Sequence, residues 1–369
     1  MENKPLKLMI PGPIQPADDV LESMGAPVRP HYGPDFTAFY NETVELLRKV
    51  FETDGDLFIM VGSGTVALDA GLGSLLSSGE KILVGVNGFF GERLQSIAES
   101  YGLGVIPVTA EWGDALRAAD FDAAFRAHPE ASAAVVVHLE TSTTVINPVE
   151  EIGVVTRKLG KVFMVDGVSS VGGLPLKMDE WGIDLCVTAS QKCLGAPPGL
   201  AVAAVGRQGW EAINRNHNKS HGWYGDLRVW KWYAQNWGDW HPFPVTMATS
   251  NVCALNTALQ GLLAEGIPQR MERYRCMAMR LRDGLRRIGY EPFTPDSMAA
   301  PVLTAAYTPC AVPSGKIVGY MEKTHGIKIS TGLGILKEKL IRIGHMSPTL
   351  TDADIDEVLE VLAGFDAGS

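Results

Sequence analysis

Short apolar runs alternate with amphipathic stretches through about the first 210 residues of the chain. The apolar runs are rich in β-branched residues and are bounded by glycine or polar residues, as buried strands are. They cover residues 56–61, 81–86, 104–109, 133–139, 162–166, 184–189 and 200–206. Amphipathic segments such as GERLQSIAESYG and EEIGVVTRKLG lie between them. Near-continuous apolar strands that alternate with helices predict an α/β fold with a mostly parallel sheet covered on both faces.

The pattern changes in the last third of the chain. An aromatic-rich segment covers residues 217–241, and a long helical stretch follows from about 250 to 289. The tail then combines strand-like runs (PVLTAAYT, IKIS and KLIRIG) with two further helical patterns. These features predict a smaller C-terminal α+β domain. We therefore expect an N-terminal arm, a large domain and a small domain at residues 1–20, 21–255 and 256–369.

Composition narrows the class of protein. The chain has 369 residues, of which 46% are hydrophobic and 20% charged, as in soluble globular proteins. Its net charge of −10 argues against a nucleic-acid or membrane-surface partner, because both need clustered positive charge. No apolar run approaches the ~20 residues that cross a bilayer, and the N-terminus lacks a secretory apolar core. Five cysteines without a CxxC pair, and no HExxH, favour reduced thiols in a cytoplasm and no metal site.

Lys192 stands at the end of the apolar run WGIDLCVTAS, with no ionisable residue nearer along the chain than Asp184. A lysine at a strand end commonly extends its amine into solvent. The alternative is a Schiff-base lysine, whose amine becomes nucleophilic when burial or a nearby cation lowers its pKa. The residues upstream favour this second interpretation.

Asp166 ends another apolar run, VFMVD, and precedes Gly167. An Asp before Gly can simply form a turn. At the end of a parallel strand, however, it also points into the crevice where α/β sheets bind ligands. An aspartate facing a pyridinium nitrogen and a lysine in imine linkage to the aldehyde are the two groups that a pyridoxal phosphate site requires.

The segment VGSGTVALDAGL, residues 61–72, reads as a strand, a Gly-Ser-Gly-Thr turn and a helix. Such a turn presents backbone N–H groups and two hydroxyls to an anion, aided by the helix dipole, so a cofactor phosphate fits it. The segment also matches GxGxxA of dinucleotide-binding folds. That fold requires an acidic residue after the second strand, where this chain has Val86 and Asn87.

Two more motifs complete a candidate site. GVNGFFG follows a strand and can present Phe89 or Phe90 to a planar ring, although either phenylalanine can equally belong to the core. KLIRIG places Arg342 on a strand of the small domain, where it suits the carboxylate of an amino or keto acid or forms a surface ion pair. The aromatic segment 217–241 has too little net positive charge for nucleic acid and more commonly lines a subunit interface or a site rim.

Taken in order, the motifs GSGT, NGFFG, HLETSTTVINP, DGVSS, SQK and RIG resemble the class V, alanine–glyoxylate type of pyridoxal-phosphate aminotransferases over nearly the whole chain. The resemblance implies a fold-type I enzyme with a seven-stranded, mostly parallel sheet in the large domain. It also implies a small C-terminal domain and a homodimer whose sites lie at the interface.

The same resemblance implies a role for each matching residue. Lys192 would form the imine with the cofactor and then move the proton, while Asp166 would pair with the pyridine nitrogen. Phe90 would stack on the ring, and Arg342 would bind the substrate carboxylate with Gly12 beside it. The remaining cofactor contacts would come from Ser63, Gly64, Thr65, Thr141, Val168 and Gln191.

The chain departs from the family pattern at one place. Relatives bring a tyrosine and a threonine from the partner subunit to the phosphate, where this chain has Asp239 and Pro242. His241 or Thr246 are candidates to replace them. The stretches QKCLGAPPGL, PFPVT and RIGHM also resemble pyridoxamine–pyruvate aminotransferase, which takes free pyridoxal as a substrate. GSGT as a phosphate cradle, and Leu333 in place of that relative's second arginine, favour bound pyridoxal phosphate.

We expect transfer of an amino group from a small L-amino acid, alanine or serine, to glyoxylate or pyruvate by a ping-pong mechanism. Aminoethylphosphonate or aspartate are alternative donors. A cysteine desulfurase would need a catalytic cysteine near residues 325–340 and usually a histidine before the lysine, where this chain has Gln191. A non-catalytic binding protein of this fold would lose the lysine, aspartate or arginine, and all three are present.

Overall fold

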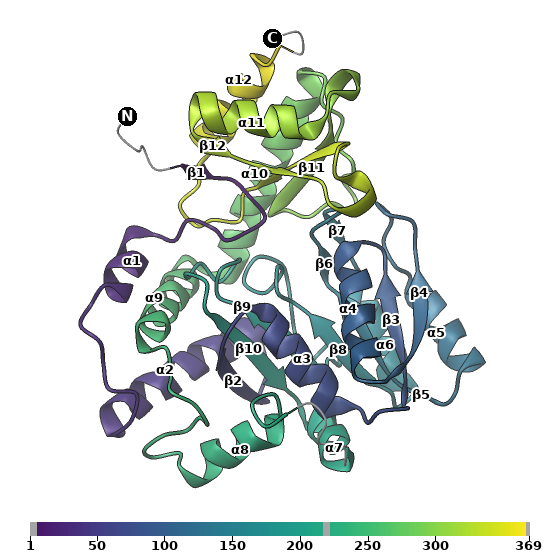
Figure 1. The fold of residues 1–369 in the computed structure, drawn as a ribbon, viewed down its shortest axis with the longest axis vertical. Coiled ribbons are helices and arrows are strands. Elements are labelled where there is room, and N and C mark those ends of the chain that lie inside the picture. Colours follow the sequence, from purple (N-terminus) through teal and green to yellow (C-terminus); the bar gives the residue numbers. More distant parts are fainter. Residues whose placement is uncertain (1–5, 217–221, 367–369) are drawn as a thin grey trace.

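A seven-stranded sheet forms the centre of the molecule. The computed structural model describes residues 6–216 and 222–366. The strands of this sheet are β2 (Asp56–Val61), β3 (Lys81–Val86), β4 (Gly104–Thr109), β5 (Ala131–Val137), β8 (Val162–Asp166), β9 (Leu185–Ala189) and β10 (Leu200–Val205). Their spatial order is β2-β10-β9-β8-β5-β3-β4 (Figure 1). Only β10 runs antiparallel to its neighbours, so the predicted mostly parallel α/β sheet is confirmed.

Helices cover both faces of this sheet. The crossovers are α3 (Gly64–Leu75), α4 (Phe89–Ser100), α5 (Ala118–Ala127) and α6 (Val149–Lys158). Connections between parallel strands are right-handed, and the strand order reverses its direction after β4. Therefore α3 and α4 lie on one face of the sheet, while α5 and α6 lie on the other. The buried strands carry apolar residues continuously because neither face meets water.

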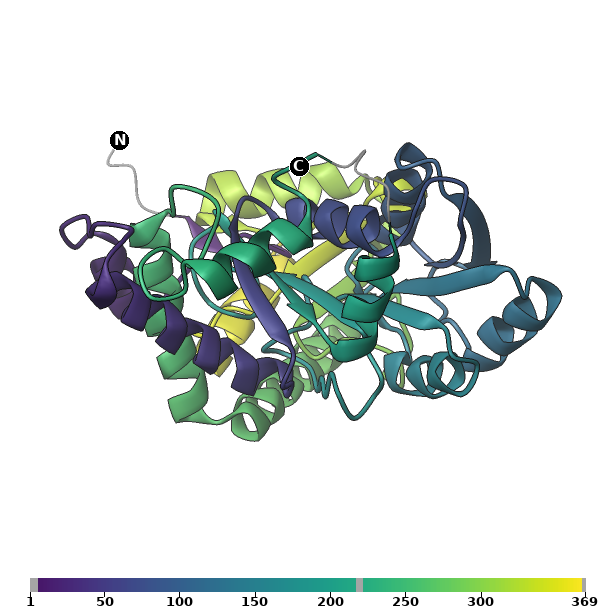
Figure 2. The ribbon, with the colours of Figure 1, turned by 90° about the horizontal axis from the view of Figure 1, so that it is seen from below.

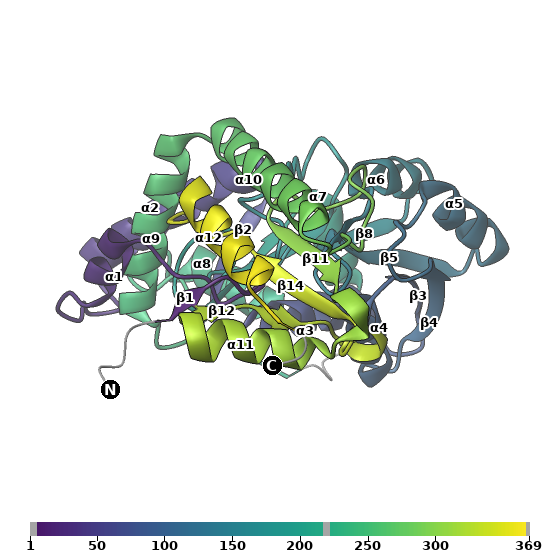
Figure 3. The same cartoon turned by 90° about the horizontal axis from the view of Figure 1, so that it is seen from above.

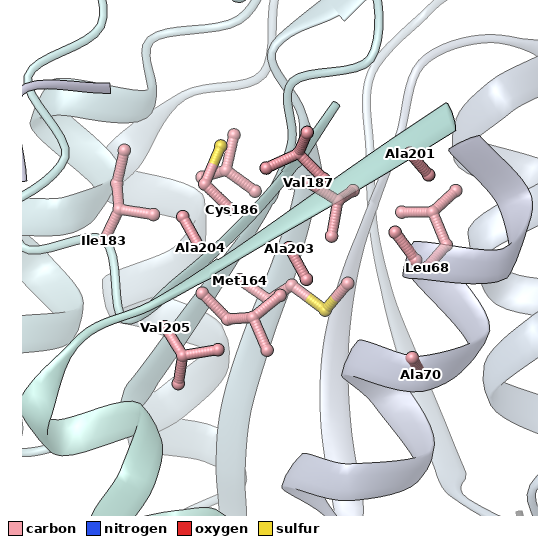
Figure 4. Packing of buried hydrophobic residues seen from close by; sticks show 14 of the residues in the cluster. Leu68, Ala70, Met164, Ile183, Cys186, Val187, Ala201, Ala203, Ala204 and Val205 are labelled. Carbon is pink, nitrogen blue, oxygen red and sulfur yellow. The ribbon is translucent and has the colours of Figure 1, made fainter. Parts of the chain in front are cut away.

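Small residues let α3 approach the sheet closely. Figure 4 shows Met164 of β8 near Ala203 of β10 and Ala70 of α3, in the space between the strands and the helix. A Cβ atom on Gly71 of α3 would lie only 2.7 Å from Met164 Cε. The alanine-rich sequence of β10, LAVAAV, thus makes room for the helix whose N-terminus carries the GSGT turn.

The remainder of the large domain surrounds the sheet. It consists of α1 (Asp18–Met24), α2 (Pro34–Phe51), α7 (Arg207–Arg215), α8 (Leu227–Asn236), α9 (Thr249–Glu265) and a hairpin of β6 (Leu139–Glu140) and β7 (Val145–Ile146). Helices α1 and α2 both pack against α9 along one flank of the molecule (Figure 2). The predicted boundary at residues 255 and 256 falls inside α9, where buried residues on both sides of it belong to one core cluster. The three-part division of the chain stays a prediction.

The C-terminal unit is built around a three-stranded antiparallel sheet of order β11-β14-β13 (Figure 3). Its elements are α10 (Ile267–Arg287), β11 (Leu303–Tyr307), a 3₁₀ turn (Pro309–Ala311), α11 (Ser314–His325), β12 (Ile327–Lys328), β13 (Ser330–Thr331), a 3₁₀ turn (Gly334–Leu336), β14 (Leu340–Gly344) and α12 (Asp352–Ala363). The helical stretch expected at 250–289 is two helices, because Gly266 adopts a φ of 87° and Pro268 follows at the start of α10.

The N-terminal arm packs against this C-terminal unit. β1 (Lys7–Leu8) pairs in parallel with β12, and Met9 and Ile14 are buried in the C-terminal core cluster. The arm then passes over the carboxyl edge of the large sheet, where Ile14 N donates to Gln191 O at 3.1 Å.

The aromatic segment is only partly described, since residues 217–221 lie outside the described ranges. In the rest of it, Trp230 is buried, whereas the other tryptophans are exposed: Trp223, Trp232, Trp237 and Trp240. None of the helices within residues 6–216 and 222–366 is long and apolar enough to cross a bilayer. The same ranges contain no group of three or more His, Cys, Asp or Glu that could hold a metal ion.

Candidate active site

A cavity of about 220 Å³ lies at the carboxyl edge of the large sheet. Asp166 ends β8, Lys192 follows β9, and the GSGT turn follows β2, so three strand ends meet there. This edge is where open α/β sheets bind ligands. The cavity is lined by Ser63, Gly64, Thr65, Leu68, Phe90, Arg93, Val137, Leu139, Thr141, Asp166, Val168, Ser169, Gln191 and Lys192.

The nine residues that the sequence suggested for cofactor contact therefore all line one cavity: Ser63, Gly64, Thr65, Phe90, Thr141, Asp166, Val168, Gln191 and Lys192. Gly12 and Arg342 lie next to it rather than in its wall. Asp239, Pro242, His241 and Thr246 do not line it either, and the His241 ring instead bonds that of His31 at 2.9 Å.

Lys192 lies in a setting that favours its neutral amine. Burial lowers its pKa to about 8, and the positive charge of Arg342 acts in the same direction. The amine donates a hydrogen bond to the carbonyl oxygen of Pro11 in the N-terminal arm. A Cβ atom on Gly12 would lie 2.6 Å from the amine, so only glycine leaves room for the lysine side chain. The half-buried amine thus loses its proton at a lower pH than an ordinary lysine and is held at the cavity by the arm.

Asp166 is a buried carboxylate whose charge has little compensation. Burial raises its pKa to about 6, while a hydrogen bond from Val168 N at 2.9 Å and the charges of Arg93 and Lys192 act against that rise. Asp166 thus accepts a local hydrogen bond, as a turn residue does, and also lines the cavity; its functional role stays a prediction. A cation placed in the cavity beside Asp166 would stabilise its ionised form and lower its pKa.

The GSGT turn forms an anion-binding geometry. Ser63 is the N-cap of α3, and Gly64 and Thr65 begin the helix. The first N–H groups of a helix have no partner within it, and the helix dipole adds partial positive charge at that end. A Cβ atom on Gly64 would lie 2.7 Å from a methyl group of Val168, so glycine lets the turn pack against the loop after β8.

Phe90 and Arg93 come from the first turns of α4. Phe90 lines the cavity with its half-buried ring, and the Arg93 guanidinium lies 4.7 Å from that ring's centroid. Sequence reasoning did not single out Arg93. Its spacing of three residues from Phe90 was the available signal, because positions i and i+3 share a helix face.

Gln191 carries an unpaired buried atom in the cavity wall. Its side-chain oxygen is buried and has no hydrogen-bond partner among the described residues. Buried polar atoms in native proteins are nearly always paired, so this oxygen can accept a hydrogen bond from a water or from a bound group. A hydroxyl group on a ring resting against Phe90 would satisfy it.

Arg342 on β14 is buried and held by two backbone carbonyls. Its Nε donates to Thr331 O at 2.8 Å and its Nη1 donates to Thr141 O at 2.9 Å. No hydrogen bond is formed by Nη2 within the described residues, which leaves it free for a ligand carboxylate. Burial lowers the pKa of Arg342 to about 10, and the charge of Glu140 opposes this shift.

The family to which the chain belongs follows from comparison with family models. The family model of class V aminotransferases matches residues 19–358. The chain belongs to this family. The fold-type I architecture inferred from its motifs is confirmed by solved members of the family that share the fold.

Relatives of this class V aminotransferase have different activities. An uncharacterised aminotransferase of Methanocaldococcus jannaschii is 38% identical, over 92% of this chain and 87% of its own. The alanine–glyoxylate aminotransferase of Nostoc sp. is 29% identical, with a TM-score of 0.93 over 98% of this chain and 96% of its own. Pyridoxamine–pyruvate aminotransferase of Mesorhizobium loti is 27% identical, with a TM-score of 0.92 over 100% and 94%.

Proposed function

We propose that this class V aminotransferase binds pyridoxal 5′-phosphate and moves an amino group from a small L-amino acid, alanine or serine, to glyoxylate or pyruvate. One observation carries the proposal. A half-buried lysine, a buried aspartate and the unpaired Gln191 oxygen line one cavity beside the N-terminus of α3. Each of these groups matches a different part of the cofactor.

The residues fit the cofactor as follows. Ser63, Gly64 and Thr65 would hold the phosphate at the helix N-terminus. Gln191 and Thr141 would face the ring hydroxyl, and the Gln191 oxygen would gain the partner that it otherwise lacks.

The ring itself would rest between side chains on its two faces. Phe90 would stack on one face and Val168 would pack near the other. Asp166 would accept a hydrogen bond from the protonated ring nitrogen, whose positive charge would stabilise the ionised carboxyl group and lower its pKa.

The bound cofactor supplies an electrophilic aldehyde and an electron-withdrawing ring, which acidify the Cα–H of an amino acid. Lys192 supplies the amine that holds the aldehyde at rest and then moves the proton from the substrate Cα. Arg342 binds the substrate carboxylate through its free Nη2. An amino donor and a 2-oxo acid would use the same carboxylate contact in turn, which is what a ping-pong cycle requires.

The donor and the oligomer are also part of the proposal. Alanine or serine is the proposed donor because the chain resembles the alanine–glyoxylate type of the family. A homodimer would bring a second copy to the phosphate end of the cavity, as the resemblance implies. A partner contact there would differ from the family pattern, because Asp239 and Pro242 occupy the usual positions.

A second candidate is pyridoxamine–pyruvate transamination, which would use the same lysine and aspartate. The missing tyrosine and threonine at positions 239 and 242 favour it, since a free pyridoxal ring has no phosphate to hold. The GSGT turn, with its open helix N-terminus, favours the bound phosphate.

The visible absorption spectrum separates these candidates. Purified protein would be incubated with pyridoxal phosphate, desalted and scanned before and after the addition of single amino acids without a keto acid. A yellow band that survives desalting and is bleached by alanine or serine supports the proposal and identifies the donor. No retained band, but pyruvate-dependent consumption of pyridoxamine, would replace it with the second candidate.

A further inference from the structure

The N-terminus of α4 is capped by side chains from a distant hairpin. Its N-cap residue is Gly88, which has no side chain to accept a hydrogen bond. Glu140 Oε2 accepts from the backbone N–H groups of Phe90 and Gly91 at 3.1 and 3.0 Å. Ser142 Oγ accepts from Phe89 N at 3.0 Å. Groups from the β6–β7 hairpin thus satisfy successive N–H groups that a helix leaves unpaired.

Glu140 is a fully buried carboxylate surrounded by donors. Besides the two α4 amides on Oε2, its Oε1 accepts from the backbone N and the hydroxyl of Ser142 at 3.0 and 2.5 Å. All these partners donate, so both carboxyl oxygens act as acceptors, and the ionised form suits this arrangement. Burial raises the pKa of Glu140, whereas the hydrogen bonds from Ser142, Gly91 and Phe90 lower it.

The same carboxylate also interacts with Arg342. The charge of Glu140 raises the pKa of that buried guanidinium. Thr141, the next residue along the chain, accepts the hydrogen bond from Arg342 Nη1. Phe90 and Arg342 come from different domains, yet both are anchored to the short segment of Glu140 and Thr141.

The sequence makes room for this carboxylate at Gly88. A Cβ atom on Gly88 would overlap Glu140 Cγ and Ser142 Oγ. The φ of Gly88 is 173°, which any residue can adopt, so the glycine serves close packing rather than backbone conformation. Gly88, the first glycine of NGFFG, therefore packs directly against Glu140 of HLETST.

We propose that Glu140 is a positioning residue that fixes the positions of both the ring of Phe90 and the guanidinium of Arg342. The cofactor ring and the substrate carboxylate are thereby held in a fixed position relative to each other. This inference rests on the proposed function, in which Phe90 faces the cofactor ring and Arg342 the substrate carboxylate. A residue that merely supported the fold would change stability. Substitution of Glu140 is expected to change the affinity for the cofactor and the KM for the amino donor as well.

The test compares Glu140→Gln with Glu92→Gln. Glu92 is an exposed carboxylate in the first turn of the same helix, so it controls for the loss of one negative charge near α4. In Glu140→Gln one of the two carboxyl oxygens becomes an NH₂ group, which cannot accept a hydrogen bond. The two donors that this oxygen served therefore lose their acceptor. We expect on the order of 10-fold weaker pyridoxal phosphate binding and ~10-fold higher KM for the amino donor, from two weakened charge-assisted contacts.

Binding is measured by titrating cofactor-free protein with pyridoxal phosphate and following absorbance and visible circular dichroism. The circular dichroism band of the bound cofactor reports ring orientation, so it should change in Glu140→Gln at saturating cofactor. Glu92→Gln should match the unsubstituted protein in all three measurements. Unchanged cofactor affinity, dichroism and KM in a folded Glu140→Gln protein would overturn the inference.

Gly88→Ala provides a second route if Glu140→Gln does not fold. The added methyl group displaces the carboxylate without removing its charge, so the same weaker cofactor binding and altered dichroism are expected, with a smaller rise in KM. If neither variant yields a folded protein, Glu140 is a stability residue and the inference is wrong. Failure of the unsubstituted protein to bind pyridoxal phosphate would instead refute the proposed function.

Discussion

Replacing Asp166 by asparagine should stabilise the cofactor-free protein and reduce the stabilisation that bound pyridoxal phosphate adds. Burial raises the pKa of Asp166 from 3.8 to about 6. Each pKa unit corresponds to about 1.4 kcal/mol, so ionised Asp166 costs the folded state about 3 kcal/mol at pH 8. The folded-state pKa lies above the unfolded one, so this cost is absent below about pH 4 and complete above about pH 6.

Thermal unfolding of cofactor-free protein measures the effect. Asparagine keeps an oxygen that can accept the hydrogen bond from Val168 N. With an unfolding entropy of ~2 cal/mol/K per residue over 369 residues, ~3 kcal/mol raises Tm by about 4 °C at pH 8. At pH 5 the gain should fall to about half, since Asp166 is then largely protonated in the folded protein. A lower Tm for the variant at pH 8, or an equal difference at both pH values, would refute the reasoning.

Asp184→Asn is the matched control. Burial also raises the pKa of Asp184 to about 6, and this carboxylate accepts a hydrogen bond from Phe163 N at 2.9 Å. It precedes β9 and so lies at the opposite edge of the sheet from the cavity. Both variants should be more stable than the unsubstituted protein without cofactor. Only Asp166→Asn should lose part of the stabilisation that pyridoxal phosphate adds, because only Asp166 is proposed to face its ring nitrogen.

Three further outcomes are expected around the same cavity. Lys192→Ala should reduce turnover by about 10³-fold and leave the far-ultraviolet circular dichroism unchanged; near-normal turnover would contradict the assignment. The rate at which cofactor-free protein takes up pyridoxal phosphate should rise with pH and level off above about pH 8, as Lys192 loses its proton. A stopped-flow series in which the rate keeps climbing to pH 10 would indicate an ordinary, exposed lysine. Arg342→Gln should raise KM for the amino donor by ~10–100-fold with a smaller change in kcat, which steady-state kinetics would detect.

The large sheet was predictable because its strands are buried on both faces. Continuous apolar runs such as DLFIMV and VFMVD have the same bounds as β2 and β8. The meeting of Asp166 and Lys192 at one edge was predictable for the same reason, since Asp166 ends such a run, Lys192 follows another, and parallel strands end at one edge.

Contacts between distant short segments were not predictable. β6 and β7 contain two residues each, too few for a periodic pattern. Glu140 is a carboxylate inside an apolar region, and nothing near it in the sequence shows that its donors come from α4. The local pattern of apolar and polar residues predicts burial and secondary structure. A polar contact between residues 50 apart in the sequence depends on how the elements pack in the folded protein.

The pairing of β1 with β12 has a consequence for biosynthesis. The N-terminal arm leaves the ribosome first, but its strand partner is encoded more than 300 residues later. Domains form during synthesis from the N-terminus onward, so the large sheet can assemble while the arm has no place to dock. Pro11 and Gly12, which border the Lys192 amine, can therefore reach their positions only after residues 327 and 328 have been made. A nascent or C-terminally truncated chain can thus hold a folded sheet and still lack the arm contacts that hold the Lys192 amine.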